Sequence, residues 1–137
     1  MRPTVLYIED HPDNMTLVRR ILQSESYTLI EAGTGLQGIY IAENQDIDVI
    51  LLDVNLPDID GYEVARRLRA SQKTSLANTP IIAVTANAMK GDAQKILDAG
   101  ADLYISKPIN IQELLNTVQG LTPMEEVSDH DKQHFVY

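Results

Sequence analysis

The sequence contains no cysteine, which excludes disulfides and thiolate metal sites and agrees with a cytoplasmic location. It also contains no apolar run that approaches the length of a membrane span. Arg2-Pro3-Thr4 leads directly into the first apolar segment, so the hydrophobic core of a signal peptide is missing as well. We therefore expect no membrane partner.

Basic residues are few. The chain holds 11 lysines and arginines against 20 aspartates and glutamates, which gives a net charge of −9. A nucleic-acid surface needs clustered lysine and arginine, so we expect no nucleic-acid partner. Apolar residues, by contrast, make up 44% of the 137 residues, which suits one globular domain with a core.

Short apolar runs alternate with helical patterns along most of the chain. The expected strands cover residues 4–8, 27–31, 48–52, 81–84 and 102–105. Each is followed by apolar residues at helical spacing, as in Met15, Val18 and Leu22. Strict alternation with short loops predicts an α/β fold with a doubly wound five-stranded parallel sheet, for which 2-1-3-4-5 is the common strand order.

Two helices and one loop allow more local predictions. The second helix carries three apolar residues on one face: Leu36, Ile39 and Tyr40. The outer side of the third helix is expected to be a solvated face of arginines: Arg66, Arg67 and Arg69. Residues 71–79 have the composition of a polar loop.

The alternating pattern stops after Gly120. Residues 122–132 are acidic and lack helical periodicity, so we interpret the end of the chain as a tail. The expected organisation is one domain over residues 1–121 and an acidic C-terminal tail over residues 122–137.

Polar side chains follow four of the five expected strands. The first strand is followed by Glu9 and Asp10, the third by Asp53, the fourth by Thr85 and the fifth by Lys107. In open α/β sheets the carboxyl ends of the strands are where ligands bind. We therefore expect these five residues to converge on one edge of the sheet.

This combination of residue types has a specific chemistry. Three neighbouring acids repel one another and require a cation, and hard oxygen ligands with room for water suit Mg²⁺. A lysine suits a phosphoryl oxygen, and a threonine hydroxyl can donate to another. The set describes a phosphoryl-transfer site in which a carboxylate such as Asp53 becomes an aspartyl phosphate. Each residue alone has an ordinary explanation as a cap, a strand end or a surface charge.

At these positions the chain resembles the receiver domain of two-component response regulators, over residues 4 to about 120. The resemblance rests on Ile8-Glu9-Asp10, Leu52-Asp53, Leu56-Pro57 with Asp60-Gly61, Val84-Thr85-Ala86, and Gly100-Ala101-Asp102 leading to Lys107-Pro108. It implies the flavodoxin-like (βα)5 fold. It also implies a single-domain type, since no output-domain pattern follows.

The resemblance assigns roles to the site residues. It implies that Asp53 accepts a phosphoryl group from a histidine kinase or a histidine phosphotransfer protein. Mg²⁺ is then held by Asp10 and Asp53, by Glu9 through water, and by the backbone carbonyl of Asn55. Such a domain is a phosphoacceptor that catalyses only its own phosphorylation and dephosphorylation.

The resemblance also implies how a signal leaves the site. Thr85 and Lys107 contact the phosphoryl oxygens, and Tyr104 turns inward as Thr85 moves. The Lys107–Pro108 bond is usually cis in this family. The surface that changes is the face of the fourth helix, fifth strand and fifth helix, residues 89–118. That face is expected to contact an unknown downstream protein and could also pair two copies of the domain.

Three other protein classes fit less well. A haloacid-dehalogenase-like phosphohydrolase places a second acid two residues after its nucleophile, where this chain has Asn55. A flavodoxin-like flavin binder needs a Ser/Thr/Gly-rich phosphate loop after the first strand, where the acids of residues 9–13 would repel a phosphate. A DNA-binding regulator needs a helix-turn-helix segment and a basic surface.

The remaining candidates are expected to have ordinary roles. His11 is expected to be a loop or cap residue. His130 and His134 have the i, i+4 spacing of a metal pair, but no further ligand cluster accompanies them. Met89 and Met124 are expected to pack against other apolar residues.

Overall fold

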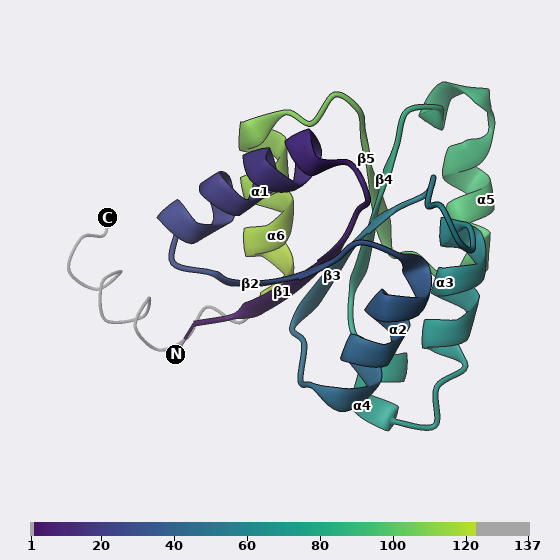
Figure 1. The fold of residues 1–137 in the computed structure, drawn as a ribbon. Coiled ribbons are helices and arrows are strands. Elements are labelled where there is room, and N and C mark those ends of the chain that lie inside the picture. Colours follow the sequence, from purple (N-terminus) through teal and green to yellow (C-terminus); the bar gives the residue numbers. More distant parts are fainter. Residues whose placement is uncertain (1, 123–137) are drawn as a thin grey trace.

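The structure is a computed structural model that describes residues 2–122. One sheet is covered by helices on both faces, which gives three layers (Figure 1). Its strands are β1 (Thr4–Ile8), β2 (Thr28–Ala32), β3 (Val49–Asp53), β4 (Ile81–Thr85) and β5 (Leu103–Ser106). Its helices are α1 (Pro12–Ser24), α2 (Gly35–Asn44), α3 (Gly61–Arg69), α4 (Thr74–Ala77), the 3₁₀ turn η1 (Ala88–Lys90), α5 (Asp92–Ala99) and α6 (Ile111–Leu121).

The sheet has the predicted topology. Its strands run in the order β2-β1-β3-β4-β5, and every neighbouring pair is parallel. The register pairs Ile8 with Leu52 and Asp53 with Val84. The carboxyl ends of β1, β3 and β4 are therefore level with one another, so residues that follow these strands leave the sheet at the same edge.

The core lies in two parts, one on each side of the sheet. Helices α1 and α6 cover one face, and α2, α3, α4 and α5 cover the other (Figure 1). In β3, Val49 and Leu51 pack on the α1 side, whereas Ile50 and Leu52 pack on the α2 side. All four are fully buried, as expected for a central parallel strand, and each contributes roughly 1.5–3 kcal/mol by its burial. This packing gives Asp53 a rigid base.

The buried face of α2 differs from the sequence-based prediction. Leu36 and Tyr40 are exposed, whereas Gly35, Gly38 and Ala42 are buried. A Cβ at Gly38 would overlap the side chain of Ile8, so the backbone of α2 packs directly on β1. This close approach requires small residues. Leu36 and Tyr40 are left on the outer surface, whereas Ile39, the third residue of the predicted face, packs partly against the core.

Residues 71–79, predicted as a loop, contain the short helix α4. Leu76 from this helix is almost fully buried in the core on the α2 side. The Thr79 hydroxyl donates to the backbone oxygen of Ser75 at 2.8 Å, which closes the turn after α4. One apolar side chain among polar neighbours was too weak a pattern to predict a helix.

Arg69 also departs from its prediction, because it is not part of a solvated face. Its guanidinium donates to the backbone oxygens of Gly100 at 2.8 Å and Thr79 at 2.6 Å, and to the Asp102 carboxylate at 2.6 Å. Asp102 in turn accepts from the backbone N–H of Ile81. Arg69 thus joins the end of α3 to the segments that lead into β4 and β5.

The end of α6 is the last part of the chain that is described. The backbone N–H of Thr122 donates to the oxygen of Val118 there at 3.1 Å. The rest of the predicted tail, with Met124, His130 and His134, lies outside the described residues. Within residues 2–122, no helix is long and apolar enough to cross a membrane.

Candidate functional site

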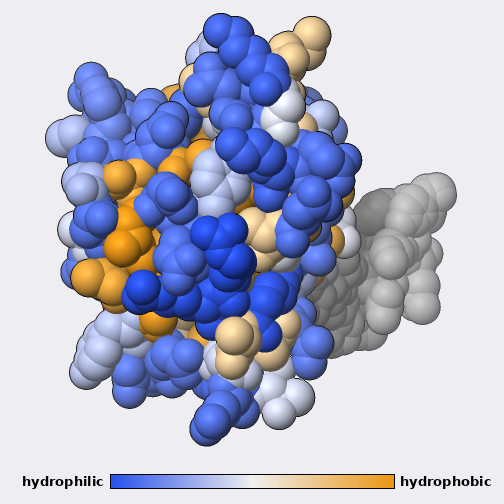
Figure 2. Space-filling model, turned by 90° about the vertical axis from the view of Figure 1, so that its right-hand side faces the viewer, coloured by the Kyte–Doolittle hydropathy of each residue, from blue (hydrophilic) through white to orange (hydrophobic). Residues whose placement is uncertain are grey.

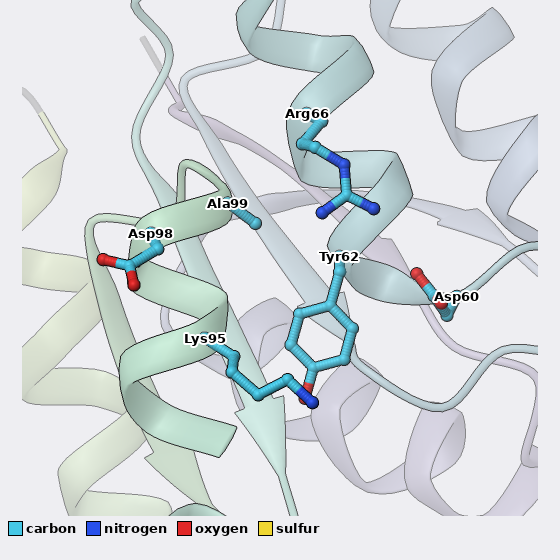
Figure 3. Close-up of a pocket in the computed structure, with 6 residues that line it drawn as sticks. All are labelled: Asp60, Tyr62, Arg66, Lys95, Asp98 and Ala99. Atoms are coloured by element: carbon cyan, nitrogen blue, oxygen red, sulfur yellow. The ribbon is translucent and has the colours of Figure 1, made fainter. Parts of the chain in front are cut away.

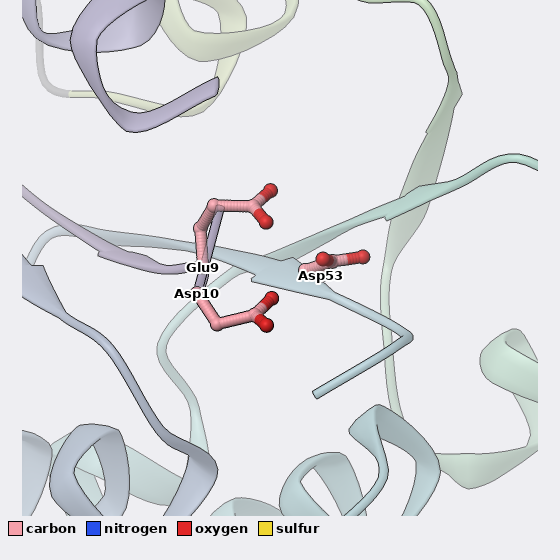
Figure 4. Close-up of side chains that lie close together, drawn as sticks. All are labelled: Glu9, Asp10 and Asp53. Atoms are coloured by element: carbon pink, nitrogen blue, oxygen red, sulfur yellow. The ribbon is translucent and has the colours of Figure 1, made fainter. Parts of the chain in front are cut away.

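Three carboxylates gather at the carboxyl edge of the sheet. Glu9 and Asp10 follow β1, and Asp53 is the last residue of β3. One oxygen from each lies within 4.8 Å of the other two, and Figure 4 shows the side chains pointing toward a common space. Glu9 and Asp53 are buried, whereas Asp10 is exposed. The cluster is therefore shielded from water on one side and open to solvent on the other.

The Glu9 carboxylate is held by three hydrogen bonds. Its Oε1 accepts from the Tyr7 hydroxyl at 2.9 Å and from the Asn14 amide at 3.4 Å, and its Oε2 accepts from the backbone N–H of His11 at 3.1 Å. Burial and the nearby charge of Glu9 raise the pKa of Tyr7. The Tyr7 hydroxyl therefore keeps its proton and acts as a donor.

Asp53 is only 2% exposed. Its Oδ1 accepts from Lys107 Nζ at 3.1 Å and from the backbone N–H of Asn55 at 3.2 Å. Burial, together with the neighbouring Glu9 carboxylate, raises the pKa of Asp53 to about 6, although Lys107 opposes this shift. Lys107 Nζ also lies 3.8 Å from Glu9 Oε1. One lysine is thus shared between two buried acids and leaves negative charge in excess.

Thr85 and Lys107 are tied to each other through the backbone. Thr85 is the last residue of β4 and is completely buried. Its hydroxyl accepts from the backbone N–H of Asn87 at 3.0 Å, and its carbonyl accepts from the N–H of Lys107 at 2.8 Å. The Lys107–Pro108 peptide bond is cis, as the family resemblance implies. The ends of β4 and β5 are joined at the point where Lys107 reaches Asp53.

Two other predicted residues, Asn55 and Tyr104, are exposed. Asn55 is in the loop directly after Asp53, and its side chain faces solvent. Tyr104 in β5 is 42% exposed, so its ring is on the outer surface.

Met89 is 96% exposed in η1, which shows that the expectation of a packed methionine was wrong. Leu103 and Ile111 are also exposed, so β5 and the start of α6 present apolar surface.

Sequence reasoning missed two residues that shape the site. Tyr7 was assigned only to the strand core, although residues two apart in a strand share a face and the Tyr7–Glu9 spacing was visible. Asp58 accepts from the backbone N–H groups of Gly35 and Leu36, each at 2.8 Å, over a separation that no local pattern reveals. His11 caps α1 as expected, because its Nδ1 accepts from the N–H of Asp13 at 3.2 Å.

The carboxylate cluster fits a divalent cation. It offers three hard oxygen donors within 4.8 Å of one another, and one of them is exposed to solvent so that water can complete the coordination. Burial and the neighbouring Glu9 raise the pKa of Asp53, and a bound cation would offset both effects. The residues are therefore of the right type and spacing for Mg²⁺.

A separate cavity of about 380 Å³ lies between α3 and α5. Lys95 Nζ is 5.3 Å from the centroid of the Tyr62 ring there, a cation–π contact that joins the two helices (Figure 3). The other lining residues are Asp60, Arg66, Asp98 and Ala99. None of the three clustered carboxylates lines this cavity.

The molecular face turned to the viewer in Figure 2 is mainly hydrophilic, with smaller hydrophobic areas between the polar ones.

The fold and the site together define a protein with a buried aspartate, Asp53, at the end of a central parallel strand and two further carboxylates beside it. The chain belongs to the response regulator receiver domain family, whose pattern it matches over residues 5–119. It is 37% identical over 119 residues to the polar-differentiation response regulator DivK of Brucella ovis, a match that covers 87% of this chain and 95% of DivK.

Solved structures agree with this membership. The receiver domain of the sensor histidine kinase PA1611 from Pseudomonas aeruginosa is 37% identical, with a TM-score of 0.82 over 88% of this chain and 98% of that one; it has a magnesium ion coordinated in the active-site cleft. The receiver domain of Ssk1 from Saccharomyces cerevisiae, solved with the histidine phosphotransfer protein Ypd1, is 26% identical with a TM-score of 0.82, over 88% of this chain and 89% of that one.

Proposed function

We propose that this domain accepts a phosphoryl group on Asp53 from a histidine kinase or a histidine phosphotransfer protein. The observation that carries the proposal is the position of Asp53, which lies beside two further carboxylates and 3.1 Å from Lys107 Nζ. In the transfer, an Asp53 oxygen forms a bond to phosphorus while the bond between phosphorus and the donor histidine nitrogen breaks. The electron pair stays on that nitrogen, which takes up a proton.

The chain's own residues prepare this step. Asp10 and Asp53 would hold Mg²⁺ directly, Glu9 through water, and Asn55 through its backbone carbonyl. The ion supplies positive charge that offsets the charge of the phosphoryl oxygens. Lys107 adds a second positive charge beside Asp53, and the buried side of the cluster keeps bulk water from the aspartate. The magnesium ion in the PA1611 receiver supports the choice of metal.

Signal output depends on the residues behind Asp53. The aspartyl phosphate brings new acceptor oxygens to the end of β3, and the Thr85 hydroxyl is the proposed donor to one of them. In the present structure that hydroxyl accepts a bond from Asn87, and the Tyr104 ring is on the outer surface. Movement of Thr85 toward the phosphate would vacate space that Tyr104 then fills.

The proposed partner is a phosphoryl donor, either a histidine kinase or a histidine phosphotransfer protein. The Ssk1 receiver was solved with a histidine phosphotransfer protein, which supports a donor of this kind for the present chain. The domain would catalyse only its own phosphorylation and dephosphorylation, since Asn55 occupies the place where a phosphohydrolase has a second acid. We also propose a cytoplasmic location, in keeping with a chain that has no cysteine.

The direct test is chemical phosphorylation. Acetyl phosphate with Mg²⁺ should add one base-labile phosphoryl group, detected by intact mass, and Asp53→Asn should remove it. Asp46→Asn is the matched control, because its side chain is fully exposed and away from the cluster. Labelling of Asp53→Asn to the level of the wild type would show that the phosphoacceptor has been misassigned.

A further inference from the structure

We propose that Tyr7 is a positioning residue of the metal site, because its buried hydroxyl holds the Glu9 carboxylate in the orientation that serves Mg²⁺. This inference rests on the proposed function, in which Asp10 and Asp53 hold the ion directly and Glu9 holds it through water. Tyr7 lies one residue before the Ile8-Glu9-Asp10 motif on which the family resemblance rests. The structure adds the hydrogen bond by which Tyr7 takes part in the site.

The position of Tyr7 in β1 explains the contact. Its side chain is fully buried in the core on the α1 side of the sheet. Glu9 is two residues further along, so both side chains leave the chain on the same side. The phenol group spans the distance, and its hydroxyl lies 2.9 Å from Glu9 Oε1. A buried hydroxyl needs a partner, and Glu9 is the partner within reach.

Glu9 needs such a restraint because its side chain has several rotatable bonds. Of its three hydrogen bonds, the one from Tyr7 is the shortest and comes from the most deeply buried donor. The Asn14 amide reaches the same oxygen only at 3.4 Å. A carboxylate fixed before the metal arrives does not have to be ordered on binding, and this preorganisation raises affinity.

Tyr7→Phe tests the inference because it removes the hydroxyl and leaves the ring. The readout is the Mg²⁺ dissociation constant of the full chain, measured by titration with amide chemical shifts. We expect Mg²⁺ to bind about tenfold more weakly, the lower end of the usual effect of losing an outer-shell partner. Tyr27→Phe is the matched control, since Tyr27 is buried in the same core and its hydroxyl lies 3.4 Å from Thr122 Oγ1. The Mg²⁺ dissociation constant of Tyr27→Phe should equal that of the wild type.

A purely structural role for Tyr7 predicts a different result. Unfolding in EDTA would then show a loss of stability in Tyr7→Phe, with the Mg²⁺ affinity of the folded protein unaltered. Weakening by threefold or more in Tyr7→Phe, with Tyr27→Phe unchanged, supports the positioning role. Weakening below threefold, tighter binding, or an equal effect in both variants overturns it. A wild-type chain that binds no Mg²⁺ overturns the proposed function as well, so the two failures are distinguishable.

A second measurement needs no variant of the site. With ¹³C at the tyrosine Cζ positions of the wild type, added Mg²⁺ should shift the Tyr7 signal, because the ion draws electron density from the carboxylate that accepts its hydrogen bond. The Tyr27 signal should stay in place. A Tyr7 signal that does not respond to saturating Mg²⁺ contradicts the inference.

Discussion

Asp53 carries an electrostatic conflict at the scale of a single residue. It is buried beside Glu9, and both effects raise its pKa to about 6 from an ordinary 3.8, while Lys107 relieves only part of the repulsion. A carboxyl whose pKa is raised by folding contributes stability at low pH. That contribution is complete below about pH 4 and is lost as the pH rises through about 6. At neutral pH the ionised Asp53 therefore lowers the stability of the metal-free protein.

We predict that Asp53→Asn stabilises the metal-free protein at pH 8. Two pKa units correspond to about 3 kcal/mol, and screening by nearby solvent reduces the expected gain to roughly 1–2 kcal/mol. Urea unfolding in EDTA at pH 8 and at pH 4 measures this, and the gain should shrink at the lower pH. Asp46→Asn should have no effect at either pH. A variant that is less stable than the wild type at pH 8 would contradict the assigned repulsion.

The residues that sequence alone could place are those governed by simple rules. Asp53 and Lys107 follow apolar strands, and the parallel topology brings strand ends together, so their proximity was predictable. Tyr7 and Arg69 could not be assigned in this way. A tyrosine in a strand looks like core and an arginine on a helix looks like surface, and only the fold shows which polar atoms lie within reach.

At the scale of elements, Asp58 links the loop after β3 to α2. Both carboxylate oxygens accept from the first N–H groups of α2, at Gly35 and Leu36. This gives the helix a cap from a distant segment and anchors the loop that carries Asn55. Burial opposes ionisation of Asp58, but the N–H donors of Leu36 and Gly35 outweigh it and lower the pKa. A lowered pKa gives stability above the unfolded-state value, and this is lost as the pH falls through the folded-state value.

We predict that Asp58→Ala destabilises the domain by about 0.5–1 kcal/mol at pH 7, the usual effect of losing a helix cap on an exposed surface. Asp58→Asn should lose less, because its amide oxygen still accepts one bond. Denaturant unfolding at pH 7 and below pH 4 measures the difference, which should decrease at low pH. An alanine variant as stable as the wild type would show that α2 needs no cap from the loop.

Helix α2 shows where a prediction from helical periodicity fails. In α2 the apolar residues Leu36 and Tyr40 have helical spacing, yet they are exposed, and it is Gly38 that faces β1. Hydrophobic periodicity assumes that the largest side chains are buried, and it fails where two backbones approach closely, as at Gly38 and Ile8. The existence and order of the elements were predictable, because they depend on local periodicity and on the rules of parallel sheets.

For the molecule as a whole, metal binding should couple to folding. Mg²⁺ bound by the native state alone stabilises it, by about 2.7 kcal/mol when the ion is at one hundred times its dissociation constant. We predict a rise in Tm with added Mg²⁺, seen by calorimetry, of roughly 3 °C for each kcal/mol. Asp10→Ala removes a proposed direct ligand and should lose most of this rise, whereas Asp46→Ala should retain it. Equal Tm shifts in Asp10→Ala and the wild type would exclude Asp10 from the site.

Phosphorylation is proposed to act on the whole domain by shifting a population between two arrangements. In this proposal, a phosphoryl group on Asp53 would favour the arrangement in which Thr85 donates to it and Tyr104 moves inward. The surface expected to change, residues 89–118, lies on η1, α5, β5 and α6 and includes the exposed Met89, Leu103 and Ile111. Apolar side chains that are open to solvent give a protein partner, or a second copy of the domain, a surface on which to bind.

The prediction is that beryllofluoride, a mimic of the phosphoryl group, changes amide exchange chiefly within residues 85–118. The change should depend on the Thr85 hydroxyl, since this hydroxyl is the proposed donor to the new oxygens. Thr85→Ala should therefore lose the response of the distal surface, whereas Thr85→Ser, which keeps the hydroxyl, should retain it. Both variants should still bind beryllofluoride, because Asp53 and Lys107 are intact. Exchange that changes only around α1, or a full response in Thr85→Ala, would show that the signal leaves the site by another route.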